Sequence, residues 1–504
     1  MLMLLQEVHS AAEVSLTRHW AGYTALAIFI LAYLAVVFEV KLHLRKTKLD
    51  IVAAGLIWML IGIAYAAMGD STTASSAIRH NVGDFAELLL FILVAVTYVN
   101  TMEERGVFDA LRVALVRRRL SLRNLFWITG ICAFFLSSQI DNLTTALVLG
   151  TVVLTLGRGN PSFVALGCIN VVVAANAGGA WSPFGDITTL MVWQAGRVGF
   201  FEFYSLFLPA LVNWFVPAFI MQFALPKTRP EAVFEDVYVK RGGWTVVGLF
   251  ALTIAITVSA YNLLKLPPFI GMTTGLGLLK LYSYLLSNTR PRLSRHLSEA
   301  METLALPGEN PPREPGFVRS VATPAITFTQ QNVQLSPAAV RLETSQIVLA
   351  PTVARRTRPY ETFDVMSIIQ RAEWDTLLFF YGIILCVGGL ATIGYLSGVS
   401  QALYGGLGPT MANTIVGIIS AVVDNIPVMF AILNMSLDMN LTQWLLVTMT
   451  AGVGGSMLSV GSAAGVALMG QARGQYTFMK HLKWSWAIAL GYAASIAVHL
   501  LING

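Results

Sequence analysis

The feature that most constrains this chain is a short polar element that occurs twice inside long apolar stretches. The sequence reads Ser-Ser-Gln-Ile-Asp-Asn at residues 137–142 and Ser-Ala-Val-Val-Asp-Asn at residues 420–425, so each copy places an Asp-Asn pair four residues after a Ser. An ionisable side chain at bilayer depth costs roughly 2.5–3.5 kcal/mol on insertion scales. Two matching copies therefore indicate two related halves around one central polar site, an arrangement typical of secondary transporters.

The composition is that of a polytopic membrane protein. Of the 504 residues, 56% are hydrophobic and only 12% are charged, whereas soluble domains carry about 25% charged residues. The formal net charge is +6, and its basic residues lie between apolar runs, which indicates cytoplasmic loops rather than nucleic-acid binding. The three cysteines lie in apolar segments without a Cys/His cluster. We therefore expect no disulfide framework, zinc site or cofactor.

A helical span of a bilayer needs about 20 apolar residues. Eight ranges of the sequence satisfy this requirement without interruption. They are residues 21–40, 49–68, 85–103, 203–225, 242–262, 266–287, 373–397 and 484–502.

Four further apolar ranges are interrupted. Residues 124–157 and 409–440 hold the Asp-Asn elements midway, and flanks of about 15 residues are short for a crossing. We predict that both are re-entrant helical hairpins with the polar element at the tip. Residues 163–196 and 442–470 contain central Gly-rich clusters, which predict broken helices, because unwound backbone at this depth needs protein or a water-filled cavity around it. The expected architecture is an all-α fold with ten crossing helices and two hairpins.

The order of these features occurs twice: an acidic span, a hairpin, a broken helix and a final span. Glu87 precedes the apolar run of the first acidic span, and Asp375 precedes that of the second. The basic loops fall on one side of this topology, which the positive-inside rule makes cytoplasmic. The two copies then run in opposite directions through the bilayer. The repeats are therefore predicted to be inverted, with the hairpin tips meeting near the midplane.

The chain is expected to divide into four segments. Residues 1–20 form an N-terminal segment. Residues 21–287 contain the first membrane half together with the first spans of the second half, at 242–287. Residues 288–372 hold nine prolines, ten arginines and no lysine, which predicts a largely disordered cytoplasmic linker. Residues 373–504 complete the second half.

The polar residues expected at the centre are carboxylates, amides and hydroxyls, which are the oxygen ligands that suit a hard cation. Neither motif region contains Arg or Lys, so an anionic substrate would lack a charged partner. A buried carboxylate can hold a proton or a small cation but not both well, and this competition is what a cation/proton antiporter requires. The candidate residues are Asp141, Asn142, Thr144, Thr145, Asn176, Ser182, Asp186, Thr188, Thr189, Asp424, Asn425, Ser456, Ser459 and Ser462.

Four runs of residues resemble the NhaD-type sodium/proton antiporters of the ion transporter superfamily. They are the two Ser-x-x-x-Asp-Asn elements, the run Asn-Ala-Gly-Gly-Ala-Trp-Ser-Pro-Phe-Gly-Asp-Ile-Thr-Thr at 176–189, and the run Gly-Gly-Ser-Met-Leu-Ser-Val-Gly-Ser-Ala-Ala-Gly at 454–465. The resemblance extends from about residue 20 to the end, except for the linker. It implies exchange of cytoplasmic Na⁺ or Li⁺ for external H⁺ across a bacterial inner membrane. It also implies the homodimer common in this superfamily.

The resemblance also carries roles to individual residues. We expect Asp141 and Asp424 to carry both the proton and Na⁺, with Asn142 and Asn425 completing the cation shell. Ser420 is a further predicted ion-binding position. Glu87, Asp375 and Thr376 are predicted to tune or relay protons. The alternatives are that Ser420 only bonds a helix carbonyl, and that Glu87 and Asp375 are structural charges at helix ends.

Two other functions compete with this interpretation. A sodium-coupled dicarboxylate symporter of the same superfamily would share the layout, but its hairpin tips carry Ser-Asn-Thr, whereas these tips carry an acid where an anion would need to approach. An intramembrane aspartyl protease also buries two aspartates, and Phe184-Gly185-Asp186 touches that signature. However, Pro183 occupies its first Gly position, and no Tyr-Asp partner lies upstream.

Overall fold

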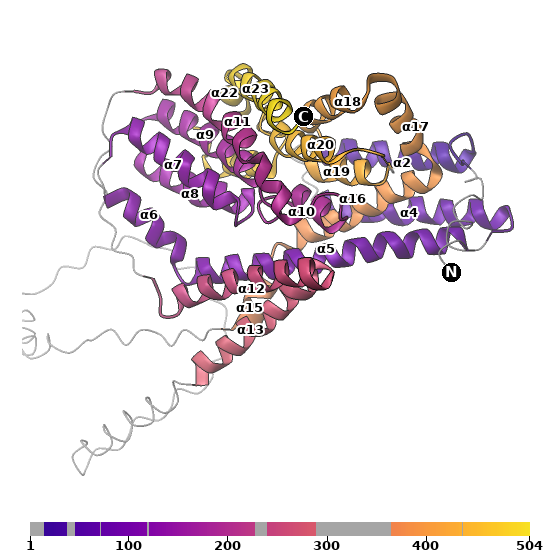
Figure 1. The fold of residues 1–504 in the computed structure, drawn as a ribbon, viewed down its shortest axis with the longest axis horizontal. Coiled ribbons are helices and arrows are strands. Elements are labelled where there is room, and N and C mark those ends of the chain that lie inside the picture. Colours follow the sequence, from indigo (N-terminus) through magenta and orange to yellow (C-terminus); the bar gives the residue numbers. More distant parts are fainter. Residues whose placement is uncertain are drawn as a thin grey trace, which may run out of the picture. The chain divides into compact units, whose positions relative to one another are not determined.

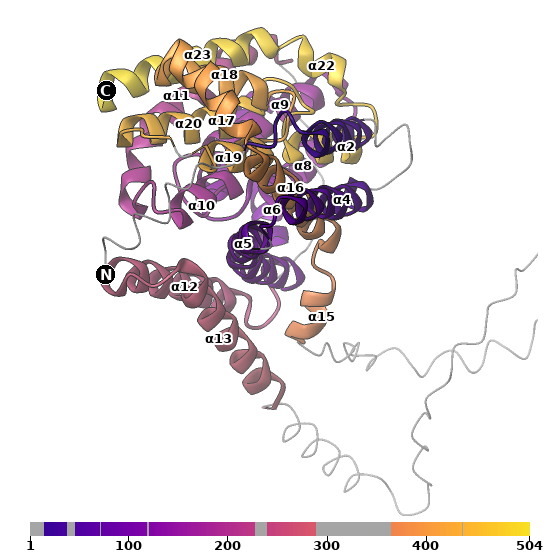
Figure 2. The same ribbon diagram turned by 90° about the vertical axis from the view of Figure 1, so that its right-hand side faces the viewer.

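A computed structural model describes residues 15–37, 46–70, 72–117, 120–226, 239–288, 364–435 and 437–504. All regular structure within these ranges is helical (Figures 1 and 2). The fold is therefore all-α, as predicted. Most of the N-terminal segment and residues 289–363 of the predicted linker lie outside the described residues.

The helices of the first part of the chain begin with a pair that precedes the repeat. This pair is followed by the long acidic helix, the two hairpin arms, the broken helix and the final helix of the first half. Their bounds are α2 (Trp20–Val37), α4 (Lys46–Ala67), α5 (Thr73–Glu104), α6 (Val107–Arg117), α7 (Leu122–Ser137), α8 (Asn142–Leu156), α9 (Pro161–Gly179), α10 (Ile187–Gln194), η2 (Phe200–Leu206), α11 (Phe207–Met221) and η3 (Gln222–Ala224).

The second part follows the same order. Its helices are α12 (Gly243–Leu264), α13 (Pro268–Asn288), α15 (Val365–Gln370), α16 (Trp374–Ile393), α17 (Tyr395–Ser400), η5 (Gln401–Gly405), α18 (Pro409–Ser420), α19 (Asn425–Leu433), α20 (Leu441–Gly454), α21 (Ala463–Gln471), α22 (Phe478–Leu482) and α23 (Ser485–Asn503).

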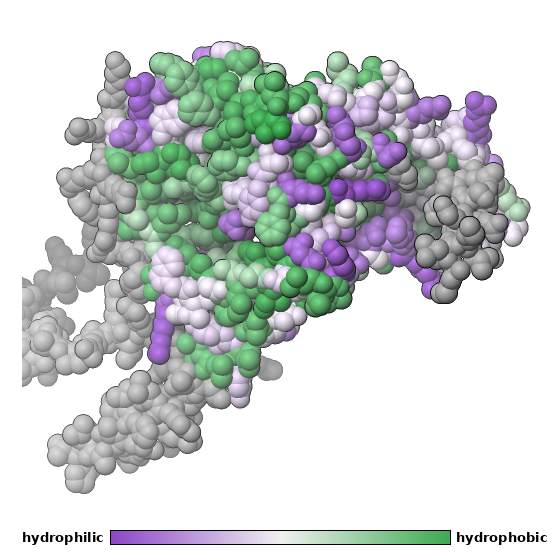
Figure 3. All heavy atoms as spheres, in the orientation of Figure 1, coloured by the Kyte–Doolittle hydropathy of each residue, from purple (hydrophilic) through white to green (hydrophobic). Residues whose placement is uncertain are grey.

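Eight helices in the described part of the chain are long and apolar enough to cross a membrane. Seven coincide with predicted spans, and the eighth is α9, the first part of a predicted broken helix. Broad apolar areas are visible on the surface (Figure 3), and large apolar side chains such as Leu263 and Phe223 are exposed. The protein is therefore a multi-pass membrane protein. The ten-crossing topology and the re-entrant character of the hairpins remain predictions.

Helix α5 is longer than the predicted span 85–103, because it begins at Thr73. The Asp70 carboxylate accepts hydrogen bonds from the backbone N–H groups of Thr72 and Thr73, at 2.8 and 3.0 Å, and so satisfies the start of the helix. The additional turns contain polar residues, and their low hydropathy kept them out of the predicted span. They are nevertheless packed, since Asn81 is buried and lies directly against Gly388 of α16.

The two halves pack in the same way. Arm α7 packs on α9 and α8, and arm α18 packs on α20 and α19. A Cβ atom at Gly178 of α9 would lie 2.1 Å from the Phe134 carbonyl oxygen of α7, and one at Gly454 of α20 would lie 2.0 Å from the Gly417 carbonyl oxygen of α18. Only glycine permits this approach of two helix backbones. The repeat inferred from sequence is thus present at the level of individual contacts.

The helix pairs that precede each repeat pack on the acidic helix of the other half. Helices α2 and α4 pack on α16 (Figures 1 and 2), and α12 packs on α5. The first contact buries an apolar cluster that includes Ile57, Ile61 and Leu390, and the Trp58 indole donates to the Leu385 carbonyl oxygen. The sequence did not indicate this exchange, because apolar faces carry little information about their partner.

The end of the predicted linker belongs to the folded part of the chain. Residues 365–370 form α15, which packs on α5 and buries Val365 and Ile368. Arg371 pairs with Glu104 at 2.9 Å. The predicted linker boundary at 372 is therefore wrong for these residues. The prolines and arginines upstream led to that boundary, whereas the short apolar run 365–369 is what packs.

The close crossing of backbones predicts a strong effect of one methyl group. We expect Gly178→Ala and Gly454→Ala each to destabilise the protein by about 1–3 kcal/mol, because the added Cβ must displace backbone. The measurement is the melting temperature of purified protein in detergent. Gly55→Ala on α4 is the matched control, since no atom lies within 4 Å of its Cβ position. Equal melting of the Gly178 and Gly55 variants would contradict the crossing.

Candidate functional site

One cavity of about 430 Å³ is lined by the Asp-Asn pairs of both halves, Asp141-Asn142 and Asp424-Asn425. Both aspartates lie where the first hairpin arm ends and the second begins. The sequence predicted a shared central site, and the structure brings the two pairs to the walls of the same space.

The N-termini of four helices face this cavity. The residue before the first turn is Asp141 in α8, Asp186 in α10, Asp424 in α19 and Ser462 in α21, and each of these residues lines the cavity. A helix N-terminus carries roughly half of a positive elementary charge, which stabilises a carboxylate there. The breaks in both hairpins and both broken helices therefore generate the polar surface of the site.

The capping interactions differ between the four ends. The Asp141 carboxylate accepts from both the Thr144 backbone N–H (2.8 Å) and the Thr144 hydroxyl (2.7 Å). The Asp424 carboxylate accepts a longer bond of 3.4 Å from the Ile426 N–H. Asp186 accepts instead from the Thr188 hydroxyl at 3.0 Å. Asp141 and Asp186 are thus each held by a Thr of the helix that they cap.

A chain of hydrogen bonds joins the first hairpin to both broken helices. Asn142 donates through Nδ2 to Asn176 Oδ1 at 3.1 Å, and Asn176 donates through Nδ2 to the Ser456 hydroxyl at 3.3 Å. The Ser456 hydroxyl donates in turn to the Val453 carbonyl oxygen at 2.7 Å. A carbonyl can only accept, so the direction of the whole chain is determined. The Asn142 amide therefore presents its oxygen away from this chain.

The second hairpin makes the reciprocal link. Asn425 donates through Nδ2 to Asp186 Oδ2 at 2.9 Å. This bond joins the tip of the second-half hairpin to the broken helix of the first half. An ionised carboxylate only accepts, which again leaves the amide oxygen of the Asn directed elsewhere. Each half thus contributes one amide whose nitrogen is engaged.

The start of α16 forms an exposed part of the cavity wall. Glu373, Asp375 and Thr376 line it together with Thr47 of α4. The Thr47 hydroxyl donates to the Asp375 carbonyl oxygen at 2.8 Å, and the Thr376 hydroxyl donates to the Glu373 carboxylate at 3.1 Å. Glu373 and Asp375 are both exposed at this end of the cavity.

The charge of the cavity has one sign. Five carboxylates line it, and none of its described lining residues is Lys, Arg or His. Within the described ranges, no three His, Cys, Asp or Glu side chains converge as a metal cluster would require. A cation bound here would thus rely on at most two carboxylates, completed by amide, hydroxyl and carbonyl oxygens.

Several predicted site residues lie behind the cavity wall. Ser420 donates to the Ala451 carbonyl oxygen at 2.7 Å, as Ser137 donates to that of Ala175 at 2.7 Å. These equivalent bonds join each first hairpin arm to its broken helix. The alternative that Ser420 back-bonds a carbonyl of its own helix differs from the structure, because the acceptor Ala451 belongs to α20.

Other predicted residues support those that line the cavity. Thr188 and Asn176 contact lining residues directly, as described above. Thr189 donates to the carbonyl oxygens of Ser182 and Asp186, at 2.9 and 2.7 Å, and so closes the break before α10. Ser459 is fully buried within the second break. Of the two matched acids, Asp375 lines the cavity and Glu87 does not.

Sequence reasoning missed four polar lining residues: Thr47, Asn100, Gln139 and Glu373. Gln139 lies inside the first hairpin element, and Asn100 is an isolated amide in an apolar span, so both carried a weak signal. Thr47 and Glu373 carried no signal in the sequence, because their position in the cavity wall depends on the packing of α4 against α16.

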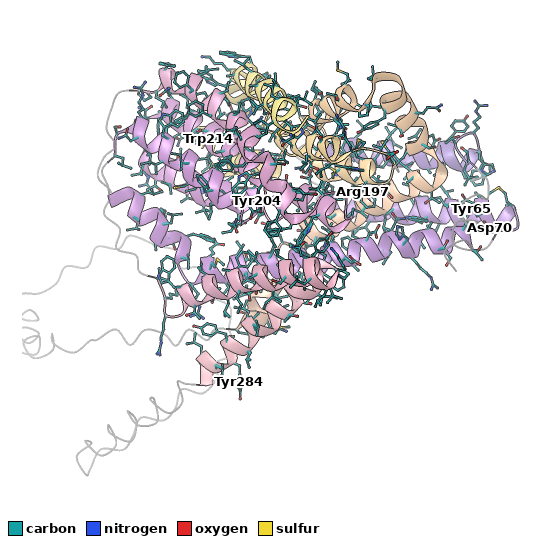
Figure 4. All side chains as sticks on the ribbon, viewed as in Figure 1. Tyr65, Asp70, Arg197, Tyr204, Trp214 and Tyr284 are labelled. Atoms are coloured by element: carbon teal, nitrogen blue, oxygen red, sulfur yellow. The ribbon has the colours of Figure 1, made fainter. Side chains whose placement is uncertain are left out.

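Aromatic side chains fix the first hairpin arm against its neighbours. Trp214 of α11 donates to Asn170 of α9 at 2.8 Å, and its ring stacks on Phe134 of α7 (Figure 4). Tyr204 of η2 packs on Trp181, which lies in the break of the first broken helix. The arm and the break are thus held by one apolar cluster.

Comparisons with known proteins identify the family of the chain. A family model described as a citrate transporter matches residues 26–452. The chain is 50% identical over 494 residues to the Na⁺/H⁺ antiporter NhaD of Alkalimonas amylolytica, with 98% of this chain and 93% of that protein covered. It is 48% identical to NhaD of Vibrio cholerae, with 97% and 93% covered. The chain belongs to the NhaD family of Na⁺/H⁺ antiporters. This confirms the resemblance inferred from the motifs.

Family membership extends to more distant proteins. Sodium/proton antiporter 1 of Arabidopsis thaliana is 28% identical over 488 residues, with 94% of this chain and 72% of that protein covered. These relatives are transporters by name, and the chain is accordingly a transporter rather than an enzyme.

The paired serine bonds predict matched behaviour. We expect Ser137→Ala and Ser420→Ala each to lower stability by roughly 0.5–1.5 kcal/mol, the usual net value of such a bond. Melting temperature in detergent and the apparent affinity for Na⁺ in everted vesicles are measured together, and both variants should change alike. A loss of Na⁺ affinity confined to Ser420→Ala would instead identify Ser420 as an ion ligand.

Proposed function

We propose that this protein exchanges cytoplasmic Na⁺, or Li⁺, for external H⁺, and that the cavity between the two Asp-Asn pairs is the transport site. The observation that carries the proposal is the convergence of carboxylates from both halves on one space whose described lining has no basic side chain. Na⁺/H⁺ exchange is also the activity in the names of its NhaD relatives.

The charge balance of the cavity supports competition between a proton and a cation. Four helix N-termini together bring roughly two positive charges, and three carboxylates cap them, at Asp141, Asp186 and Asp424. With all three ionised, the four helix ends and their caps have an excess of about one negative charge, and Glu373 and Asp375 add further negative charge to the cavity wall. One proton or one Na⁺ lowers this excess, and binding of either opposes the other.

The two amides are suited to complete a Na⁺ shell. Asn142 and Asn425 each have their nitrogen engaged, by Asn176 and by Asp186 respectively. Their oxygens are therefore presented as hard ligands beside Asp141 and Asp424. Protonation of Asp186 would weaken its acceptance from Asn425 and free that amide to rotate. A proton on Asp186 would thus disturb a cation ligand of the other half.

The competing functions fit the cavity less well. A citrate or dicarboxylate anion would meet five carboxylates and no basic side chain among the described lining residues, which would raise its energy in a low-dielectric site. Intramembrane proteolysis is not supported by any of the relatives reported above. The vesicle assay described below also tests symport, because symport would give a different outcome.

The cellular setting follows from the same reasoning. We place the protein in a bacterial inner membrane, with its basic loops in the cytoplasm by the positive-inside rule. The homodimer implied by the resemblance and the re-entrant insertion of the hairpins 124–157 and 409–440 belong to this proposal. In physiological terms the exchange would serve sodium and pH homeostasis.

The carrier assignment predicts the effect of removing one charge. We expect Asp141→Asn or Asp424→Asn to abolish Na⁺-dependent proton flux in everted vesicles, because the titrating group is lost. Asn caps a helix about as well as Asp, so insertion and melting temperature should be retained. Asp109→Asn is the control, since Asp109 is half exposed and pairs with Arg112 away from the cavity.

The same vesicles distinguish the alternatives. Adding each cation salt and each dicarboxylate in turn should give proton movement with Na⁺ or Li⁺ only. Near-normal Na⁺-dependent flux in both Asn variants would refute the assignment and move the carriers to Asp186 or Asp375. Flux that requires a dicarboxylate would favour the symporter.

The linker proposal gives a separate prediction. We expect replacement of residues 289–363 by a short Gly/Ser segment to leave exchange largely intact, because this range contains none of the motif residues from which the transport site was inferred. Extending the replacement to residue 372 should lower activity and stability, since it removes α15 and the Arg371–Glu104 pair. Loss of vesicle exchange in the shorter, well-expressed replacement would make the segment part of the mechanism.

A further inference from the structure

A buried polar pair outside the cavity contacts the second broken helix. His481 of α22 and Tyr476, just before it, are at most 1% exposed. His481 Nδ1 lies 2.7 Å from the Tyr476 hydroxyl oxygen, and Nε2 lies 2.9 Å from the Ser456 carbonyl oxygen. We propose that His481, oriented by Tyr476, is a positioning residue for the Na⁺ ligand Asn142, acting through Ser456 and Asn176. This inference rests on the proposed function.

The partners determine the state of the imidazole. The Ser456 carbonyl oxygen can only accept, so His481 Nε2 carries the hydrogen and donates it. In the neutral ring Nδ1 is then an acceptor, and the Tyr476 hydroxyl donates to it. A neutral imidazole satisfies both contacts, and Tyr476 selects the tautomer that donates to Ser456.

Ser456 needs such an anchor because it lies in the break between α20 and α21. A buried carbonyl in unwound backbone is costly without a partner. His481 supplies this partner for Ser456, and the Ser485 hydroxyl at the start of α23 donates to the neighbouring Met457 carbonyl oxygen at 2.6 Å. The segment after α21 thus packs back against the break and donates hydrogen bonds to two of its carbonyl oxygens.

The anchored residue orients the cavity amide. Ser456 accepts from Asn176 Nδ2 at 3.3 Å, and Asn176 Oδ1 accepts from Asn142 Nδ2 at 3.1 Å. A shift of Ser456 would therefore be passed to Asn142, which lines the cavity. His481 itself does not line the cavity, so its effect on Na⁺ would be indirect.

The two breaks differ in how they are closed. Both breaks contain one local bond at the same position, since the Ser182 carbonyl oxygen accepts from the Gly185 N–H and the Leu458 carbonyl oxygen accepts from the Gly461 N–H. In the second half, the carbonyl oxygens of Ser456 and Met457 accept in addition from residues beyond the broken helix. The second break therefore depends on the segment that precedes α23, and His481 is the part of that segment that connects to the Asn142 chain.

The chain offers a matched control histidine. His499 of α23 is also fully buried, and its Nε2 lies 3.0 Å from the Thr442 carbonyl oxygen. Thr442 is in the first turn of α20, away from the break, and does not line the cavity. His481 and His499 thus make the same kind of bond, but only His481 joins the chain to the site.

The experiment compares His481→Leu, His481→Gln, Tyr476→Phe and His499→Leu with the unchanged protein. Everted vesicles give the apparent KM for Na⁺ and the maximal rate of proton flux at one pH. We expect His481→Leu to raise the KM for Na⁺ about tenfold, the equivalent of one lost buried hydrogen bond. The maximal rate should change less. His481→Gln should recover much of the affinity, because its amide can donate to Ser456, and Tyr476→Phe should give an intermediate KM.

A binding measurement separates folding from positioning. The melting temperature of each purified variant is recorded in detergent with and without NaCl, and the salt concentration that raises it reports Na⁺ affinity; equal concentrations of choline chloride correct for ionic strength. His499→Leu should lower the melting temperature without changing the NaCl concentration at which the salt raises it. A shift of KM that is equal in His481→Leu and His499→Leu, or absent in His481→Leu, would overturn the proposal. Absence of Na⁺-dependent flux in the unchanged protein would instead refute the proposed function.

Discussion

The structure depends on two equivalent crossings of helix backbones. Gly178 of α9 lies against the Phe134 carbonyl of α7, and Gly454 of α20 lies against the Gly417 carbonyl of α18. Near each crossing a Ser hydroxyl bonds the broken helix, from Ser137 or Ser420. These contacts place each hairpin tip beside the break of its own half, so the ends of four helices meet at one cavity.

That meeting explains why acids occur at the tips. Four helix N-termini around a low-dielectric space would attract anions. Aspartates at three of the four capping positions reverse this preference, and for this reason we propose the cavity as a site for a proton or a cation. In that proposal the carboxylates have a structural and a chemical role at once. A neutral Asn can replace the first role but not the second, which is why the charge-removing variants are informative.

The two halves share packing but differ in chemistry. Asp186 caps α10, whereas Ser462 caps the equivalent helix α21. Asn176 precedes the first break at the position that Gly452 occupies before the second. The hydrogen-bond chains are consequently asymmetric: Asn142 is oriented through both broken helices, and Asn425 through the first alone. A proton on Asp186 would therefore act on the Asn425 amide, whereas a shift of Ser456 would act on the Asn142 amide.

The sequence by itself determined the fold class, the two-fold repeat and most polar residues of the cavity. Burial in a membrane makes each polar residue costly, so Asp141, Asp424 and Asp186 stood out against apolar surroundings, and Gly-rich runs marked the breaks. Only the tertiary structure decided the rest. The packing of α4 on α16 brought Thr47 to Asp375, and the return of the chain after α21 brought His481 to Ser456. Contacts between segments far apart in sequence depend on which apolar helix faces pack together. Hydropathy does not predict these partners, because one apolar helix face has much the same hydropathy as another.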